Sequence, residues 1–207
     1  MAFQRDYVLR MIEMMGEFFR RLGELLDEKE QLRALNDACR EQCGLSLDAA
    51  LALSVETLEG LLPPHGLMML SELSYLQAQL PSRDEEKRRA LLLRTLRLLC
   101  ALSGEEALCL ERSARLRELM DACGDALTEE DYLGCARFFM AGEHFEHGED
   151  ALFLGAEIAR DLRVYSLRGV ALLRRLLLLP DSTLIPGGLP REDVLRAIGD
   201  LEAWEKR

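Results

Sequence analysis

The residues from Phe138 to Gly155 read FFMAGEHFEHGEDALFLG, and the fold we expect for the whole chain follows from them. Apolar residues lead up to Gly142, and helical spacing resumes at about Glu146. A connection this short between two helices favours antiparallel neighbours, so the stretch predicts a helical hairpin. Gly148 and Gly155 lie seven residues apart, about two helical turns, and therefore face the same way. Small residues on that face let paired helices approach closely.

Capping signals divide the rest of the chain into further helices. Three capping boxes are expected to open helices, at Ser82 with Glu85, at Ser103 with Glu106 and, in a weaker form, at Thr128 with Asp131. Gly44 suits a helix end and Pro190 suits a first helical turn. The expected helices cover about residues 4–27, 30–43, 47–53, 55–62, 66–80, 83–102, 103–124, 128–142, 146–162, 165–179 and 190 onward, with a loop over 180–189.

The fold class predicted from this pattern is all-α. No segment shows the sustained apolar and polar alternation that strands need, and the abundant Leu, Ala, Glu and Arg favour helix. We therefore expect one helical domain over residues 1–207, an array of antiparallel helical hairpins preceded by a long amphipathic helix. The break at Pro63-Pro64-His65-Gly66 is the best candidate for a joint between N-terminal helices (1–62) and the hairpin array (66–207).

The hairpin resembles the second half of a tetratricopeptide repeat. Phe145, Gly148, Leu152 and Gly155 match that pattern in order, although Gly148 stands where a repeat usually has alanine. One residue too many separates Gly142 from Phe145, and no second copy keeps the period of about 34 residues. The resemblance implies a tetratricopeptide-like C-terminal half. Stacked hairpins of this kind form concave surfaces that bind peptides or partner helices.

The opening Phe3-x2-Asp6-Tyr7-x2-Arg10-x-Ile12-Glu13 is similar to the start of an uncharacterised all-helical family of Firmicutes. Short patches extend this resemblance, notably Glu149-Asp150-Ala151-Leu152-Phe153 and the ending Leu189-Pro190-Arg191-Glu192-Asp193. The resemblance implies a bacterial protein with a tetratricopeptide-like fold and no assigned activity. It transfers no catalytic or binding residue.

The N-terminal helix carries two neighbouring apolar stripes. One consists of Tyr7, Met11, Met14, Phe18, Leu22 and Leu25, and the other of Val8, Ile12, Met15, Phe19 and Leu26. Together they are wider than a helix needs to pack on a single neighbour. A large uncovered apolar patch marks a protein interface, and the twofold dimer is the commonest closed assembly. We therefore predict a homodimer contacted at least partly through this helix. For the methionine-rich stripe itself, protein core is the favoured interpretation, and a dimer seam and a client-binding face are the alternatives.

Charge and composition exclude several classes of partner and compartment. With 26 Lys and Arg against 37 Asp and Glu, the net charge is −11, which repels nucleic acid and anionic membranes. The chain has no apolar stretch long enough to span a bilayer, and its start lacks the order of a signal peptide. We therefore expect a cytoplasmic protein whose six cysteines are free thiols.

Two histidines in an acidic turn form the cluster with the clearest ligand chemistry. His144 and His147 lie within Glu143-His144-Phe145-Glu146-His147-Gly148-Glu149-Asp150, and imidazole with carboxylate suits a transition metal. The flanking glycines indicate a turn rather than a continuous helix. In a turn, the two histidines need not share one helical face. A solvated turn that caps the next helix is the favoured interpretation.

The cysteines and arginines also leave alternatives. Cys39 and Cys43 share a helical face, but Cys100, Cys109, Cys123 and Cys135 are scattered and complete no zinc site, so buried apolar thiols are expected. Arg94, Arg97, Arg112, Arg115 and Arg117 either line one groove that holds carboxylates or form a solvated face paired with glutamates, and we favour the solvated face.

The sequence therefore favours a non-catalytic protein-interaction or scaffold module with an unknown protein or peptide partner. The chain has no nucleophile elbow, and its glycine-rich segment at 186–190 lacks the Lys-Ser/Thr of a phosphate loop. We assign no catalytic, cofactor-binding or metal-binding residue. The alternatives are a metal-binding enzyme or regulator that uses His144 and His147, and a structural homodimer without a further client.

Overall fold

A computed structural model describes residues 2–25, 27–81 and 84–205, with side chains described from residue 10 to residue 204 except at residues 11 and 19. Every extended regular element within those ranges is a helix, and the described ranges contain no strand. The all-α prediction is confirmed. None of the described helices is both long enough and apolar enough to cross a membrane.

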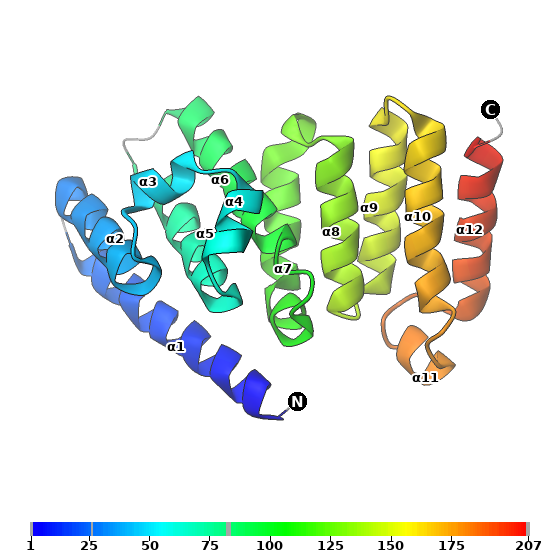
Figure 1. Ribbon diagram of the computed structural model, residues 1–207, viewed down its shortest axis with the longest axis horizontal. Helices are drawn as coiled ribbons and strands as arrows, with labels where there is room; N and C mark the ends of the chain where they lie inside the picture. Colours follow the sequence, from blue (N-terminus) through cyan, green and yellow to red (C-terminus); the bar gives the residue numbers. More distant parts are fainter. Residues whose placement is uncertain (1, 26, 82–83, 206–207) are drawn as a thin grey trace.

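The helices follow one another along the chain with short connections (Figure 1). They are α1 (Ala2–Glu24), α2 (Glu28–Cys43), α3 (Leu47–Ala52), α4 (Val55–Leu61), α5 (Pro64–Ala78), α6 (Glu85–Cys100), α7 (Glu106–Cys123), the 3-10 turn η1 (Gly124–Ala126), α8 (Glu129–Ala141), α9 (Phe145–Ile158), α10 (Leu162–Leu176), α11 (Asp181–Leu184) and α12 (Arg191–Glu205).

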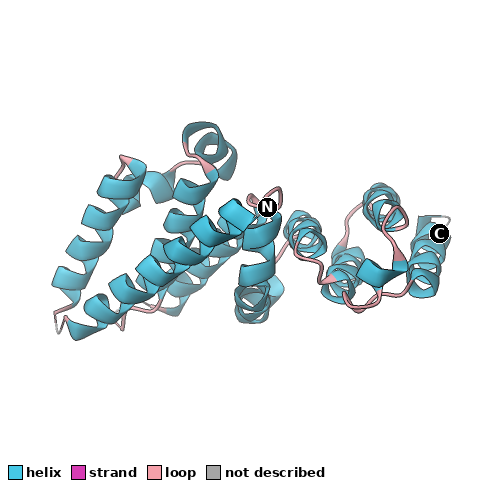
Figure 2. Cartoon of the chain, turned by 90° about the horizontal axis from the view of Figure 1, so that it is seen from below, coloured by secondary structure: helices cyan, strands magenta, loops and turns pink. Residues whose placement is uncertain are grey.

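Pairs of neighbouring helices build an elongated array. The most extensive contacts join α5 with α6, α8 with α9 and α10 with α12, and each pair runs antiparallel (Figure 1). Helix α6 also packs on α7 and α8, and α8 also contacts α10, so α6, α8 and α10 lie in one layer. Seen from below, the helices of the C-terminal half lie nearly end-on in two rows (Figure 2).

The first four helices cover one end of this array. Helices α2 and α3 pack on α5, while α1 runs obliquely across α5 and α7 (Figure 1). Elements from both sides of the Pro63-Pro64 break are therefore in contact. The division into residues 1–62 and 66–207 stays a prediction.

Local capping chemistry explains several helix boundaries. At the start of α8 the Thr128 hydroxyl accepts from the Asp131 N–H, and the Asp131 carboxylate accepts from the Thr128 N–H at 3.0 Å, which confirms the expected capping box. Helix α2 ends as expected at Gly44, whose φ of 73° lies in the left-handed region that glycine adopts at low cost.

Other boundaries differ from those expected. Ser103 does not cap α7, because it belongs to a tight turn after α6 in which its N–H donates to the Cys100 carbonyl. Ser82 lies outside the described residues, and Asp84 is the residue that caps α6. Helix α9 ends at Ile158 rather than near residue 162, because Asp161 opens α10 by accepting from the Val164 N–H. The expected 180–189 loop contains the one-turn helix α11.

The hairpin of α8 and α9 is closely packed, as the stretch 138–155 predicted. Phe138, Phe139 and Phe145 are fully buried in it. Gly148 lies within α9, where a Cβ atom would come 2.9 Å from the Met140 Cγ. The positive φ of the connecting turn falls instead on Glu143, at 59°.

The N-terminal helix buries part of its apolar surface against its own chain. Met15 and Leu22 are buried, Phe18 is half-buried, and Met14 is 47% exposed. The boundary between buried and exposed residues thus runs through the two expected stripes rather than between them. Tyr7, Val8, Met11, Phe19 and Leu26, which complete those stripes, lie outside the described side chains.

Candidate partner-binding groove

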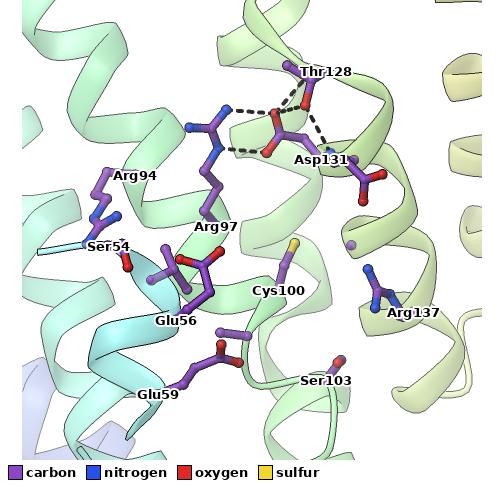
Figure 3. Close-up of a pocket in the computed structure, with 14 residues that line it drawn as sticks. Ser54, Glu56, Glu59, Arg94, Arg97, Cys100, Ser103, Thr128, Asp131 and Arg137 are labelled. Carbon is purple, nitrogen blue, oxygen red and sulfur yellow. Dashed lines mark hydrogen bonds and ion pairs between the residues drawn. The ribbon is translucent and has the colours of Figure 1, made fainter. Parts of the chain in front are cut away.

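A groove of about 600 Å³ opens on the face formed by α4, α6 and α8 (Figure 3). Its walls are mostly polar and charged, unlike the leucine-rich contacts between the helices. The lining residues are Ser54, Val55, Glu56 and Glu59 from α4 and its cap, Arg94, Arg97, Cys100, Ala101 and Ser103 from α6 and the turn after it, and Thr128, Glu130, Asp131, Gly134 and Arg137 from α8 and its cap. Three segments far apart in sequence therefore meet here.

Helix α4 is held beside α6 by an arginine. The Arg94 guanidinium donates to the backbone carbonyl of Leu53, immediately before α4. The Ser54 hydroxyl then caps α4 by accepting from the Thr57 N–H. The pKa of Arg94 is lowered, first by burial and then by the neighbouring charge of Arg97. Arg94 thus positions one wall of the groove.

An ion pair between the buried Asp131 and the half-exposed Arg97 joins α6 to α8 at the upper end of the groove. The Arg97 Nε and a terminal nitrogen donate to the two Asp131 oxygens at 2.7 and 2.9 Å, and the Thr128 hydroxyl donates to Asp131 at 2.7 Å (Figure 3). Burial by itself raises the pKa of Asp131, but the hydrogen bonds from Arg97 and Thr128 outweigh it and lower that pKa. The pair fixes the spacing of the two helices.

Opposite charges stand on opposite walls. Glu56 and Glu59 project from α4, and Arg137 projects from α8 (Figure 3). Arg137 donates to the Leu133 carbonyl of its own helix at 3.2 Å, and within the described part of the chain neither it nor Glu59 forms an ion pair. Arg137 also interacts electrostatically with Glu130 of its own helix.

Glu130, at the α8 edge of the groove, is already engaged. Its carboxylate accepts from both terminal nitrogens of Arg168 on α10. The hydrogen bond from Arg168 is the main cause that lowers the pKa of Glu130. This pair links α8 to α10 and leaves Arg137 as the cation on the α8 wall.

The arginines named from the sequence separate into two groups. Arg94 and Arg97 line the groove, as one alternative proposed, whereas the α7 arginines lie elsewhere. Arg112 and Arg115 contact the buried Glu72 of α5, with the Arg112 Nε 2.8 Å from a Glu72 oxygen. The sequence missed Arg137, since only the packing of α8 on α6 and α4 gives it a role.

The histidine turn is built differently from a metal site. His144 and His147 stack with ring centroids 6.0 Å apart, and an Arg117 nitrogen lies 3.1 Å from the His147 Nε2. A guanidinium at that distance opposes a metal cation. The described residues contain no group of three or more histidine, cysteine or acidic side chains placed to hold an ion. The pKa of His144 is lowered, first by burial and then by the charge of His147.

All six cysteines are free thiols, and Cys39, Cys109, Cys123 and Cys135 are buried. Two cysteines that are scattered in the sequence nevertheless meet in space, because the Cys100 and Cys135 sulfurs lie 3.8 Å apart. These residues are 35 positions apart in the sequence, so no local spacing signals their contact.

Neither a known family model, nor a curated protein, nor a solved structure matches this chain. The resemblance of its opening residues to a Firmicutes family, and with it the bacterial origin, therefore stays a prediction.

Proposed function

We propose that this protein is a non-catalytic helical-repeat interaction module that binds an extended peptide of mixed charge in the groove between α4, α6 and α8. The observation that carries the proposal is the pair of oppositely charged walls. Glu56 and Glu59 face the groove from α4, and Arg137 faces it from α8, without ion pairs that would neutralise Glu59 and Arg137.

The arrangement of helices supports a repeat of the tetratricopeptide kind. The side-chain caps Thr128 and Asp161 lie 33 residues apart, and each opens the first helix of an antiparallel pair, α8 with α9 and α10 with α12. The small residues Ala136 and Gly169 keep the same spacing and are both buried. In this proposal α11 is an insertion in the second hairpin.

The groove lies on α6 and α8, which contact each other. In stacked hairpins the concave surface formed by one layer of helices is available to partners. Here α6 and α8 supply the floor, and α4 closes one edge. The groove is open to solvent and its walls are mostly polar, which suits a segment of polypeptide better than a compact metabolite that needs an enclosed apolar pocket.

Charge complementarity defines the class of peptide. A lysine or arginine of the ligand would lie against Glu56 and Glu59, and an acidic side chain or terminal carboxylate would pair with Arg137. Polar contacts on both walls would orient the peptide, and like charges would reject the reverse direction. Nucleic acid remains disfavoured by the net charge of −11.

A peptide selection tests the proposal. The full-length protein is immobilised, and a library of random displayed peptides is selected for binding to it. Enriched sequences should contain one basic and one acidic position at a fixed separation. Arg137→Glu should weaken binding of the best peptide about tenfold or more, and inverting the peptide's acidic residue to lysine should restore it. Glu59→Arg should also weaken binding, and inverting the peptide's basic residue to glutamate should restore it.

Matched exposed residues outside the groove provide the controls. Arg175→Glu on α10 and Glu157→Arg on α9 make the same charge changes away from the groove and should leave the affinity unchanged. The proposal is wrong if these controls weaken binding as much as the groove variants. It is also wrong if the selected peptides show no charged pair.

A further inference from the structure

Two thiols meet at the floor of the groove. Cys100 is the last residue of α6 and is half-buried, and it lines the groove (Figure 3). Cys135 is fully buried in the middle of α8, and its sulfur lies 3.8 Å from that of Cys100. The Cys100 sulfur is therefore accessible to a reagent in the groove, and the Cys135 sulfur is buried next to it.

A glycine makes this approach close. At Gly134 a Cβ atom would lie 3.1 Å from the Cys100 Cβ and 3.3 Å from its sulfur. The absence of that atom lets Cys100 pack against the backbone of α8. The remaining gap is longer than a disulfide bond of about 2.05 Å, so the thiols are reduced and rotation of the side chains must bring the sulfurs together.

The surroundings distinguish the two sulfurs chemically. Cys100 lines the groove, with Arg97 one turn before it on α6 and Arg137 on the α8 wall, so its sulfur is the one that a reagent in the groove meets first. At Cys135, the hydrogen bond with Cys100 and then burial raise the pKa well above its ordinary value, which keeps that sulfur as a neutral thiol.

We propose that Cys100 and Cys135 form an oxidation site in which a hydroperoxide converts the dithiol to a disulfide across the groove floor. The Cys100 thiolate attacks one peroxide oxygen, so an S–O bond forms, the O–O bond breaks and hydroxide leaves. Sulfur is oxidised to sulfenic acid and the peroxide is reduced. The Cys135 sulfur then attacks Cys100, the S–O bond breaks, and the hydroxyl leaves as water with the Cys135 proton.

The disulfide would connect α6 to α8 at the level of the groove. Below the Arg97–Asp131 ion pair it adds a second, covalent link between these helices. Because the groove floor is formed by the same two helices, oxidation changes its shape and removes the exposed Cys100 thiol. This regulatory effect rests on the proposed function, whereas disulfide formation does not.

An oxidation experiment on the full-length reduced protein tests the site. The protein is treated with a small excess of hydrogen peroxide, alkylated and examined by mass spectrometry. The free thiols should fall from six to four, with a loss of two hydrogen atoms and a peptide pair linking Cys100 to Cys135. Cys135→Ala should stop at the sulfenic acid of Cys100, which dimedone traps. Cys100→Ser should show neither product. Cys43→Ser, which alters the other close thiol pair, should still form the bond.

Three outcomes overturn the site. They are oxidation of Cys100 in the intact protein without a cross-link, a cross-link between other cysteines, and no change in the thiol count. The wild-type map decides this even if a variant fails to fold. For the regulatory effect, a selected peptide should bind the reduced and oxidised proteins with affinities that differ about tenfold. Equal affinities refute the regulation alone, and failure of both forms to select any peptide refutes the proposed function alone.

Discussion

At the scale of single residues, Gly155 is a position where the two C-terminal hairpins are in close contact. A Cβ atom there would overlap the Tyr165 hydroxyl and lie 2.7 Å from the Tyr132 Cβ. Because Tyr132 belongs to α8 and Tyr165 to α10, the contact involves three helices. Such a site tolerates no added atom without a shift of its neighbours.

Gly155→Ala should therefore destabilise the protein by about 1–3 kcal/mol, the usual cost of overpacking. Gly199 on α12 provides the matched control, since a Cβ atom there meets nothing within 4 Å. Gly199→Ala should stabilise by about 0.5–1 kcal/mol, because alanine is the better helix former. Urea unfolding monitored by circular dichroism measures both. Equal effects of the two substitutions would contradict the packing described.

Asp131 provides a prediction that depends on pH. Because its pKa is lowered in the folded state, the carboxylate stabilises the fold above the ordinary Asp pKa of about 4, and this contribution is lost as the pH falls through the lowered value. Asp131→Asn should cost about 1–3 kcal/mol at pH 7. The difference from the wild type should shrink toward zero in acid. A difference that stays constant from pH 7 to pH 3 would show that the charge contributes nothing.

At the scale of the elements, sequence signals succeeded where the determinant is local. The capping box of Thr128 and Asp131 and the end of α2 at Gly44 depend only on residues within one turn. The end of α9 was missed because Asp161, which opens α10, was not recognised as a cap, and because the Arg160 N–H donates to the distant Glu129 carboxylate at 2.6 Å. Periodicity cannot reveal such a contact.

The groove could not be predicted for the same reason. The groove forms because Arg94 holds the segment before α4 and because α8 packs on α6. Both contacts join residues far apart in the sequence, so local residue spacing does not indicate them. The charged residues and the helices that carry them could be predicted from the sequence. Their meeting in one groove could not.

A buried carboxylate on α5 contacts two arginines of α7. Glu72 is 3% exposed, and it neutralises Arg112 and Arg115 of α7, with the Arg115 guanidinium stacked 3.8 Å over the Tyr75 ring. Both arginines are mostly buried, so they depend on this partner. The cluster sets which face of α7 turns inward.

Glu72→Gln should cost roughly 3–5 kcal/mol, because it leaves buried positive charge uncompensated. Glu118 is the control, since it pairs with the same Arg115 from a side chain that is 65% exposed. Glu118→Gln should change the free energy of unfolding by less than about 1 kcal/mol. Denaturant titration compares the two variants, and similar losses would argue against the buried cluster as a stabilising feature.

At the scale of the whole molecule, the homodimer expected through α1 stays a prediction with a revised contact. Leu22 is buried in the single chain, so a charge there would damage the monomer itself. Met14 is exposed and lines a second groove, of about 410 Å³, between α1, α2 and α5. This residue is the better probe of an interface.

Met14→Glu should convert a dimer to a monomer without loss of helicity. Sedimentation equilibrium of the wild type and the variant, with circular dichroism as the check on folding, measures the effect. A wild-type protein that sediments as a monomer contradicts the dimer. A folded variant that remains dimeric excludes this face of α1 from the interface.

The central claim is that the groove between α4, α6 and α8 is the surface that partners contact. Hydrogen-exchange mass spectrometry of the full chain, with and without the best selected peptide, tests it most directly. We expect slower amide exchange over α4, over residues 94–103 and over residues 128–137, with no change in α2 or α12. Protection confined to α1 and α2, or to the α12 end of the array, would contradict it.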